Sequence, residues 1–353
     1  MGESHSFVGI SASELDQVFR AVDKRWEQLR NQRLLLTGGT GFIGKWLLAT
    51  FLYANRKLDL SAHIVVLSRN PGAFLELFPE LRKCKDITFV QGDVRHLESE
   101  SVGRCQFAIH AATDVVASST PREILDTCIR GTSRVLDAMA DSSDSRRRVL
   151  LLSSGAVYGR ALPGMSVIPE DWVGAPDPLT PASAYGEGKR VSEMLCAMAA
   201  ASEPGLEVSI ARCFAFVGPH LPLDKHFAIG NFIRAAMRGE DIIVQGDGTP
   251  LRSYLYASDL AFWLWVMMFD APSGRAFNVG GSDAISIGEL AYRVNKVLGG
   301  KGKVQITQKP RQGAIPQAYV PSVDRIATEL GLVPKVSLDD AIMRTAHWAS
   351  HYL

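Results

Sequence analysis

The segment Thr37-Gly38-Gly39-Thr40-Gly41-Phe42-Ile43-Gly44 constrains the fold of this chain more than any other feature. It follows the apolar run Leu34–Leu36 and opens an amphipathic stretch that begins at Phe42. A glycine-rich turn in this context is typical of dinucleotide-binding folds, where N–H groups at a helix start bind a pyrophosphate. We predict that Gly38 makes the tight turn, that Gly41 admits the phosphates and that Gly44 lets the helix approach the sheet. The neighbouring residues expected at the cofactor are Thr37, Phe42 and Ile43. An ordinary strand–helix turn is the alternative.

Strands and helices alternate through the first two thirds of the chain. Continuous apolar runs such as Leu34–Leu36 indicate strands that are buried on both faces. Strands are expected at Arg33–Thr37, His63–Ser68, Ile87–Gln91, Phe107–Ala111, Val149–Ser153 and Glu207–Phe214, and helices at Phe42–Ala54, Arg122–Ala140 and Ala182–Ala201. This alternation predicts an α/β fold with a doubly wound, parallel, Rossmann-type sheet.

The two ends of the chain lack the strand–helix alternation of this central region. In residues 1–32, apolar positions from Leu15 to Leu29 follow one helical stripe, for which Ser13 is a candidate N-cap. Beyond Val217, Pro and Gly become frequent and the elements shorten, which favours a smaller α+β lobe. We therefore expect an N-terminal helix (1–32), a cofactor domain (33–217) and a mainly substrate-binding lobe (218–353). A segment near 276–281 is expected to return to the sheet.

Composition excludes several classes of protein. Among 353 residues, 38 are Lys or Arg and 37 are Asp or Glu, so the basic excess typical of nucleic-acid binders is missing. The most apolar stretch, Leu260–Phe269, has roughly half the length that spans a bilayer. The N-terminus has no secretory pattern, and the five cysteines lack metal-binding spacing. We expect a cytoplasmic protein with reduced cysteines, no metal, no nucleic acid and no membrane partner.

The end of the second expected strand bears on the choice of cofactor. An acidic residue there would bind the adenosine ribose, but this chain has Ser68-Arg69-Asn70. Because Arg69 can pair with a 2′-phosphate, we favour NADP(H), with NAD(H) as the alternative. After the third strand, Asp93 and Val94 are candidates for the adenine contact. The small residues after the fourth, Ala111, Ala112 and Thr113, leave room for a dinucleotide.

Tyr185-Gly186-Glu187-Gly188-Lys189 places a phenol and an ammonium one helical turn apart, on the same face. The ammonium stabilises the phenolate, so that Tyr185 can exchange a proton with an alcohol or ketone near neutral pH. Upstream, a serine pair ends the expected strand Val149–Ser153 and can polarise the same substrate oxygen. Tyr-x-x-x-Lys alone occurs often by chance, but its order after the glycine turn and the serines makes chance a poor explanation.

Taken together, these motifs resemble an extended short-chain dehydrogenase/reductase of the nucleotide-sugar epimerase/dehydratase family. The matching stretches are Thr37–Gly44, Gly92-Asp93, His110–Ala112, Ser153–Gly159, Tyr185–Lys189, Arg252–Asp259 and Asn278–Gly280. The resemblance implies that Ser154, Tyr185 and Lys189 are catalytic and that the C-terminal lobe contacts the substrate across a cleft. It also implies a homodimer in which the helices Arg122–Ala140 and Ala182–Ala201 pair with their copies; the alternative is that both only cover the sheet.

The chain departs from the family pattern at three places. Gly155-Ala156 stands where sugar 4,6-dehydratases have an Asp-Glu pair, which disfavours dehydration. Ala215 and Cys128 replace asparagines, of which the first would hold the substrate diphosphate. Arg252 and Arg311, in stretches that resemble the family's phosphate-binding segments, are therefore the expected diphosphate ligands. Asn231 is a candidate nucleotide contact or a helix cap.

The sequence thus predicts hydride transfer between NADP(H) and C4 of a nucleotide-diphosphate sugar, with 4-keto reduction or 4-epimerisation as the outcome. The alternatives are a sugar-nucleotide dehydratase, a reductase of a non-nucleotide carbonyl and, more remotely, a non-catalytic NADP-sensing protein.

Overall fold

The computed structural model describes residues 7–113, 119–140, 146–225, 227–311, 313 and 315–352. The chain divides into two compact units, each built from several segments. Unit 1 comprises Met1–Val157, Ala175–Arg212 and Ala261–Phe277, and unit 2 comprises Tyr158–Gly174, Cys213–Leu260 and Asn278–Leu353. The division into a cofactor domain that ends at residue 217 and a separate substrate-binding lobe stays a prediction.

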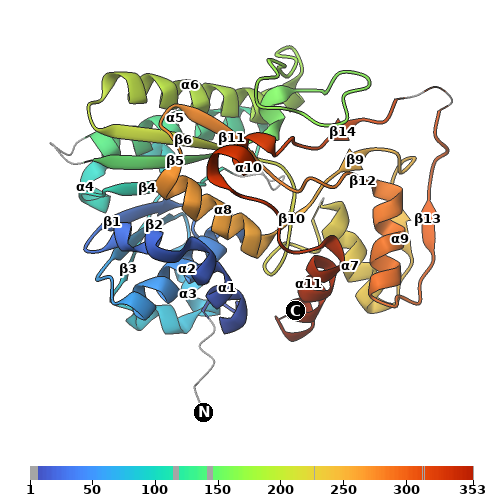
Figure 1. Cartoon of the computed structure of the whole chain (residues 1–353), viewed down its shortest axis with the longest axis horizontal. Helices are drawn as coiled ribbons and strands as arrows, with labels where there is room; N and C mark the ends of the chain where they lie inside the picture. The colour runs from blue at the N-terminus through green and yellow to red at the C-terminus, as the bar shows by residue number, and fades with distance from the viewer. Residues whose placement is uncertain are drawn as a thin grey trace. The chain divides into compact units, whose positions relative to one another are not determined.

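A seven-stranded sheet runs through the described part of unit 1, in the order β11-β6-β5-β4-β1-β2-β3 (Figure 1). Its strands are β1 (Arg33–Thr37), β2 (His63–Ser68), β3 (Ile87–Gln91), β4 (Phe107–His110), β5 (Arg147–Ser154), β6 (Leu206–Cys213) and β11 (Arg275–Val279). Parallel pairing joins β1 to β2 and β4, β2 to β3, and β4 to β5. The predicted Rossmann-type sheet is confirmed, and β11 is the returning strand.

Helices cover both faces of this sheet. On one face lie α5 (Pro121–Ala140) and α6 (Ala184–Ser202), and their apolar residues share a core with Leu35, Val65 and Ala108 of the strands. On the other face α2 (Phe42–Leu58) lies near α8 (Ala257–Asp270), where the Trp265 indole donates to Thr50 Oγ1 at 2.8 Å. Alternate residues of each buried strand thus face different helix layers, which explains their unbroken apolarity.

The N-terminal segment differs from the single helix expected there. Helix α1 spans Ala12–Val22, and its N-cap is Ser11, whose Oγ accepts from Glu14 N; the expectation for Ser13 was wrong because Ser13 already lies inside the helix. The helix ends where Asp23 adopts φ 58°, and the 3-10 helix η1 (Asp23–Leu29) follows. Trp26 still becomes fully buried, with its ring centroid 4.8 Å from that of Trp265.

Short elements complete both units. Unit 1 also has α3 (Pro71–Leu77), η2 (Pro79–Lys83), η3 (Val94–His96), α4 (Ser99–Val102), η4 (Gly155–Tyr158, whose last residue is in unit 2) and η5 (Pro181–Ser183). Unit 2 contains the helices α7 (Ala228–Arg238), α9 (Ile287–Val297), α10 (Asp324–Leu330) and α11 (Leu338–Tyr352). Its strands pair as β7 (Phe216–Val217) with β10 (Leu255–Tyr256), β8 (Ile242–Val244) with β13 (Val304–Ile306), and β9 (Leu251–Arg252) with β12 (Ile285–Ser286) and β14 (Ala318–Tyr319).

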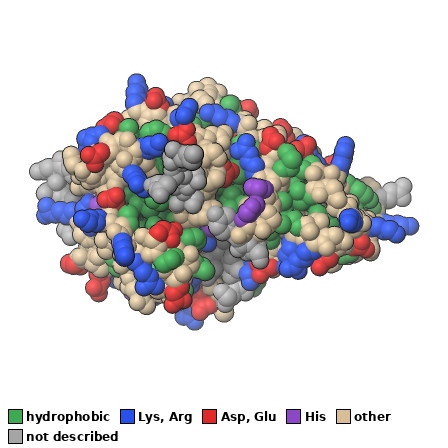
Figure 2. All heavy atoms as spheres, turned by 90° about the horizontal axis from the view of Figure 1, so that it is seen from below, with side chains coloured by type: hydrophobic (Ala, Val, Ile, Leu, Met, Phe, Trp, Pro, Cys, Tyr) green, Lys and Arg blue, Asp and Glu red, His purple; other side chains and the backbone are tan. Residues whose placement is uncertain are grey.

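Charge is mixed over the surface. On the face drawn in Figure 2, acidic and basic side chains of the described residues alternate without a broad patch of one sign. Within the same described ranges, no helix has the length and apolarity needed to cross a membrane. Nor do the described His, Cys, Asp and Glu side chains form a cluster that could hold a metal ion.

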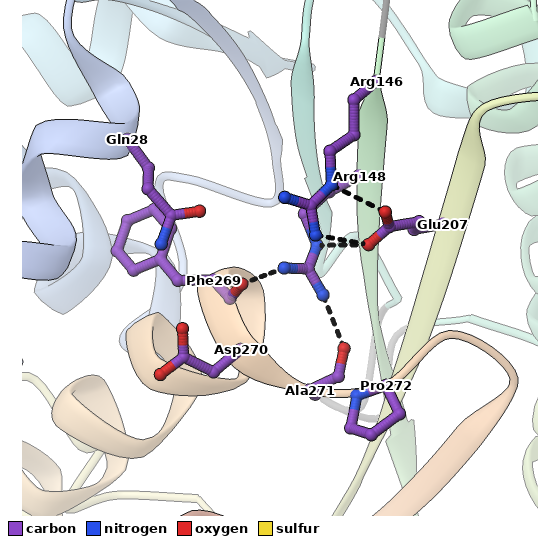
Figure 3. A pocket seen from close by; sticks show the side chains of 8 residues that line it. All are labelled: Gln28, Arg146, Arg148, Glu207, Phe269, Asp270, Ala271 and Pro272. Carbon is purple, nitrogen blue, oxygen red and sulfur yellow. Dashed lines mark hydrogen bonds and ion pairs between the residues drawn. The ribbon is translucent and has the colours of Figure 1, made fainter.

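A cavity of about 630 Å³ opens at the amino ends of β5 and β6, the sheet edge opposite to Ser154. Figure 3 shows how Arg148 fills its floor: the guanidinium donates to Phe269 O and Ala271 O at the end of α8 and pairs with Glu207. The side chain is only 6% exposed, and burial lowers the pKa of Arg148 from its ordinary value. The residues here are thus engaged in holding α8 to the sheet, a cation at a helix C-terminus.

Replacement of Arg148 by methionine is expected to destabilise unit 1 by about 2 kcal/mol, because the carbonyls of Phe269 and Ala271, at and just after the end of α8, would lose this donor. Urea unfolding measures this difference. Arg146→Met is the matched control, since Arg146 also pairs with Glu207 but is 63% exposed, and a change below about 0.5 kcal/mol is expected for it. Equal losses in the two variants would contradict the assignment.

Candidate active site

The glycine turn between β1 and α2 is held by close backbone packing. Gly38 has φ +71°, and a Cβ there would lie 2.7 Å from the carbonyl of Ala111. A Cβ on Gly44 would lie 2.2 Å from Gly38 O, so the helix can rest against the turn only without a side chain. A Cβ on Gly41 would lie 3.3 Å from its nearest neighbour, Gly38 O, so packing within the protein explains this glycine less well. A turn of bare backbone at the start of α2 fits the diphosphate of a dinucleotide.

Beneath this turn, Thr37 joins the ends of β1 and β4. Its buried Oγ1 accepts from the N–H groups of Ala111 and Ala112, both at 3.2 Å, and lies 2.8 Å from His110 Nδ1. Because the oxygen already accepts two bonds, its proton is left for Nδ1. Burial, with a smaller effect of the Lys189 charge, lowers the pKa of His110 to about 3, so the imidazole is neutral. Thr37 therefore shapes the floor of the turn, while its side chain is occupied within the protein.

At the end of β3, Arg95 clamps Asp93. Its Nε and NH2 atoms donate to the two carboxylate oxygens at 3.0 and 2.8 Å. This bonding is the main cause that lowers the pKa of Asp93 to about 2, and the Arg69 charge contributes less. Asp93 is thus an anion throughout the neutral range. The Val94 side chain is buried, and a Cβ on Gly131 of α5 would lie 2.8 Å from it, so this side chain belongs to the core.

The three residues expected to be catalytic all lie in unit 1. Ser154 is the last residue of β5, and Tyr185 and Lys189 lie in the first turns of α6. Lys189 is 3% exposed, and its Nζ donates to Leu152 O at 2.7 Å and to Thr113 Oγ1 at 2.8 Å. The structure thus joins the ammonium to the carboxyl ends of β4 and β5, where the expected cofactor residues Ala111, Ala112 and Thr113 also lie.

Two glycines in the Tyr185–Lys189 stretch explain how α6 reaches this position. A Cβ on Gly186 would lie 2.7 Å from Ala156 O, just after β5. A Cβ on Gly188 would lie 2.8 Å from the Cys128 side chain of α5. Because either contact would push the helix outward, the glycines let Tyr185 and Lys189 approach the strand ends.

The cofactor candidates Phe42, Ile43 and Arg69 lie in unit 1, the first two in the first turn of α2 and Arg69 directly after β2. The candidate substrate contacts other than Ser154 lie in unit 2. The Arg252 guanidinium rests over the Tyr319 ring, 5.5 Å from its centroid, and donates to Leu251 O. Arg311 is exposed, and its neighbour Gln312 lies outside the described residues. Asn231 is not a helix cap, because the N-cap of α7 is Phe227; its amide donates instead to Lys225 O in the preceding loop.

Comparisons with known proteins identify the family of the chain. Residues 34–280 match the model of the NAD dependent epimerase/dehydratase family. The chain belongs to this family. UDP-glucuronic acid decarboxylase 6 of Arabidopsis thaliana is 30% identical over 88% of this chain and 87% of its own. dTDP-glucose 4,6-dehydratase of Streptomyces niveus is 26% identical over 90% and 92%. The structure of MoeE5 in complex with UDP-glucuronic acid and NAD is 26% identical, with a TM-score of 0.72, and covers 91% of this chain and 100% of that one.

As a member of the epimerase/dehydratase family, the chain is an enzyme of the nucleotide-sugar class, as the resemblance implied. Sequence reasoning overlooked two charged residues at the site. Arg95 carries an Asp-x-Arg signal with Asp93, and Glu193 lies one helical turn after Lys189 on the same face of α6. Both the Asp-x-Arg spacing and the Lys-x-x-x-Glu spacing are visible in the sequence. Neither shows that the two side chains bind one another, and the second does not indicate the partners of Glu193.

Proposed function

We propose that this enzyme transfers hydride between C4 of a nucleotide-diphosphate sugar and NADP(H), with 4-keto reduction or 4-epimerisation as the outcome. The observation that carries the proposal is the Lys189 ammonium, which is buried on α6 one turn after Tyr185 and bonded to Leu152 O, two residues before Ser154. These residues lie at the carboxyl ends of the strands, the same edge of the sheet as the glycine turn after β1, as a dinucleotide site requires.

Each residue has a definite task in this reaction. The bound nicotinamide dinucleotide supplies or accepts the hydride, and the turn Gly38–Gly44 with Phe42 and Ile43 would hold its diphosphate. In the oxidation direction, the Tyr185 phenolate takes the proton of the C4 hydroxyl as the C4–H bond breaks; in reduction, the Tyr185 hydroxyl returns a proton to the C4 oxygen. Lys189 stabilises the phenolate, and the Ser154 hydroxyl donates to the same substrate oxygen.

Two observations bear on the fate of the sugar after its oxidation at C4. Gly155 and Ala156 in η4 offer no carboxylate, and elimination of water from a hexose needs an acid and a base at that place. Decarboxylation is a second candidate, favoured by the decarboxylases among the relatives. A uronic acid oxidised at C4 is a β-keto acid, which loses CO₂ without a carboxylate base. The Gly155-Ala156 pair therefore weighs against a dehydratase but not against a decarboxylase.

A binding screen of UDP-, GDP-, CDP- and dTDP-sugars, each with and without NADPH or NAD, tests the proposal. The ligand that binds is then incubated with the enzyme, and the products are identified by NMR. Epimers or reduced sugars support the leading proposal, CO₂ release supports the second candidate, and a 4-keto-6-deoxy sugar would establish the dehydratase. If no nucleotide diphosphate binds, or if Arg252→Ala leaves such binding unchanged, a non-nucleotide carbonyl becomes the better substrate.

The cofactor preference depends on Arg69, which is exposed at the end of β2. We propose that it pairs with the 2′-phosphate of NADP(H), although the solved relative MoeE5 holds NAD. Arg69→Ala is expected to weaken NADPH binding about 10-fold or more and to leave NADH binding unchanged, because only NADPH carries the partner of the guanidinium. Fluorescence titration measures both affinities, with the exposed Lys83→Ala as the charge-matched control. Tight NAD(H) that co-purifies and resists dialysis would contradict the preference.

We also propose a homodimer formed through α6. The apolar stripe of α5 is used within the core, but α6 leaves Met194 and Met198, one turn apart, 63% and 60% exposed. Met198→Lys is expected to dissociate the dimer, because burying an unpaired ammonium at an interface is costly. Light scattering at about 10 µM measures the mass, with Met343→Lys on the exposed face of α11 as the control. A monomeric wild-type protein would exclude the dimer.

A further inference from the structure

A carboxylate on α6, Glu193, binds two residues from neighbouring strands of unit 1. Ser153 Oγ donates to Glu193 Oε1 at 2.6 Å. Arg212 forks onto the same carboxylate, with Nε 3.0 Å from Oε1 and NH2 2.7 Å from Oε2. The side chains of Arg212 and Glu193 are 17% and 13% exposed, so the ion pair is largely withdrawn from water. Bidentate pairs of this kind fix both distance and orientation.

The positions of these residues connect the pair to the catalytic group. Ser153 directly precedes Ser154 at the end of β5, and Arg212 lies near the end of the adjacent strand β6. On α6, Glu193 lies one turn beyond Lys189 and on the same face. Lys189 Nζ donates to Leu152 O, and Glu193 accepts from the next residue, Ser153. Two successive residues of β5 therefore hold two successive turns of α6.

We propose that Glu193 is a positioning residue: through Ser153 and Arg212 it fixes α6 at the end of β5, so that Lys189 stays beside Tyr185 and both stay aligned with Ser154. This role rests on the proposed function of those three residues. Glu193 itself is not the acid or base that Gly155-Ala156 fails to supply, because Ser153 and the Arg212 fork engage both of its oxygens.

The chemistry requires a carboxylate at this position. A glutamine could still accept from Ser153, but it carries no charge and its NH₂ group cannot accept from Arg212, so the bidentate ion pair would lose its charge and one of its two acceptor oxygens. Glu193→Gln should therefore loosen the attachment of α6 without creating a cavity, whereas Ser153→Ala removes one bond and keeps the ion pair. The two variants separate the contributions of β6 and β5.

The test compares Glu193→Gln and Ser153→Ala with Glu187→Gln, which removes a charge from the same helix where the ion pair to Arg190 is longer, at 3.6 Å, and more exposed. For Glu193→Gln we expect kcat to fall about 10-fold, with a smaller fall for Ser153→Ala, none for Glu187→Gln, and less than a threefold change in the KM of the sugar nucleotide. The acid limb of the kcat profile, which reports Tyr185, should move to higher pH, because an ammonium displaced from the phenol no longer stabilises the phenolate.

The direction of this pH shift is decisive. Loss of a nearby negative charge by itself would favour the phenolate and move the limb to lower pH, so a shift upward identifies displacement of Lys189. The three groups whose pKa the Lys189 charge affects, His110, Cys128 and Cys196, are all shifted away from neutral pH. The pKa of His110 is about 3, and burial raises the pKa of the Cys128 thiol and raises that of Cys196 to about 12. A uniform loss of kcat without a shift, a shift to lower pH, or wild-type kinetics for Glu193→Gln would each overturn the proposal.

Amide hydrogen exchange separates this proposal from the proposed function. Positioning by Glu193 predicts faster exchange in the α6 turns around Lys189 for Glu193→Gln than for Glu187→Gln, whatever the substrate is. If wild-type enzyme turns over no nucleotide sugar, the proposed function fails, and faster exchange still supports the attachment of α6 by Glu193. Unchanged exchange in an active wild-type background would refute the positioning role alone.

Discussion

Replacement of Tyr185 by phenylalanine is expected to reduce turnover of the nucleotide sugar by roughly 10²–10⁴-fold, the usual contribution of a positioned acid–base group. The substitution removes one hydroxyl and keeps the ring, which is half-buried at the start of α6. Lys189 keeps its bonds to Leu152 O and Thr113 Oγ1, so the shape of the site should survive. Cofactor binding should therefore stay within about threefold of wild type, since the glycine turn is untouched.

Steady-state kinetics with the sugar identified by the binding screen, together with a fluorescence titration of the cofactor, checks this result. Tyr292→Phe, on the 57% exposed tyrosine of α9, is the control for loss of a phenol elsewhere. If Tyr185→Phe retains more than a tenth of wild-type turnover, the proton passes through another group and the proposed mechanism is wrong. If turnover and cofactor affinity fall together, the tyrosine acts in binding instead.

Replacement of Asn278 by alanine is expected to destabilise unit 2 by roughly 3–5 kcal/mol, which is a large part of the stability of an ordinary domain. Asn278 is fully buried and bonds three groups that are far apart in sequence. Its Oδ1 accepts from Tyr158 Oη at 2.8 Å, and its Nδ2 donates to Ile168 O at 2.8 Å and to Ser322 O at 3.1 Å. Alanine would remove the partner of all three groups, and its methyl group is too small to fill the space of the amide.

Urea unfolding followed by circular dichroism measures the loss. Tyr158→Phe should cost less than Asn278→Ala, because it removes one bond and leaves both carbonyls paired. The double variant should be more stable than the sum of the two losses predicts, since the bond between Tyr158 and Asn278 is counted in both. Strict additivity would show that the amide and the phenol act independently, against the geometry described for them.

The strands and the candidate site residues could be read from sequence because their signals are local. Leu34–Leu36 is continuously apolar, and the turn after it needs glycine at φ +71°, so β1, the turn and the start of α2 were predicted correctly. The end of α2 was placed too early, at Ala54, whereas the helix continues to Leu58. Tyr185 and Lys189 were found because four residues make one helical turn. Local signals also failed once: Ser11 and Ser13 are equally good caps by residue type, and only the backbone shows that Ser11 is extended.

The features that escaped prediction depend on contacts between distant residues. Glu193 binds Ser153 and Arg212, and Arg148 binds carbonyls more than a hundred residues later; no period or spacing encodes either choice. The same holds for Asn231, whose partner Lys225 O lies in a loop, and for Arg252, which rests on Tyr319 of a strand far along the chain. Pattern reading supplied the chemical groups of the site, and tertiary packing decides how each is held.

The indole contact between Trp26 and Trp265 has a consequence for the order in which the protein can be made. Trp26 is synthesised long before α8, yet its buried ring packs on α8, and Arg148 in turn holds the end of α8. The last strand of the seven-stranded sheet, β11, is synthesised later still. Unit 1 therefore cannot complete its native core from a nascent chain that stops before residue 277. During translation the indole of Trp26 in η1 therefore waits without its native partner until α8 has been made, and an uncovered indole is the kind of surface that chaperones bind.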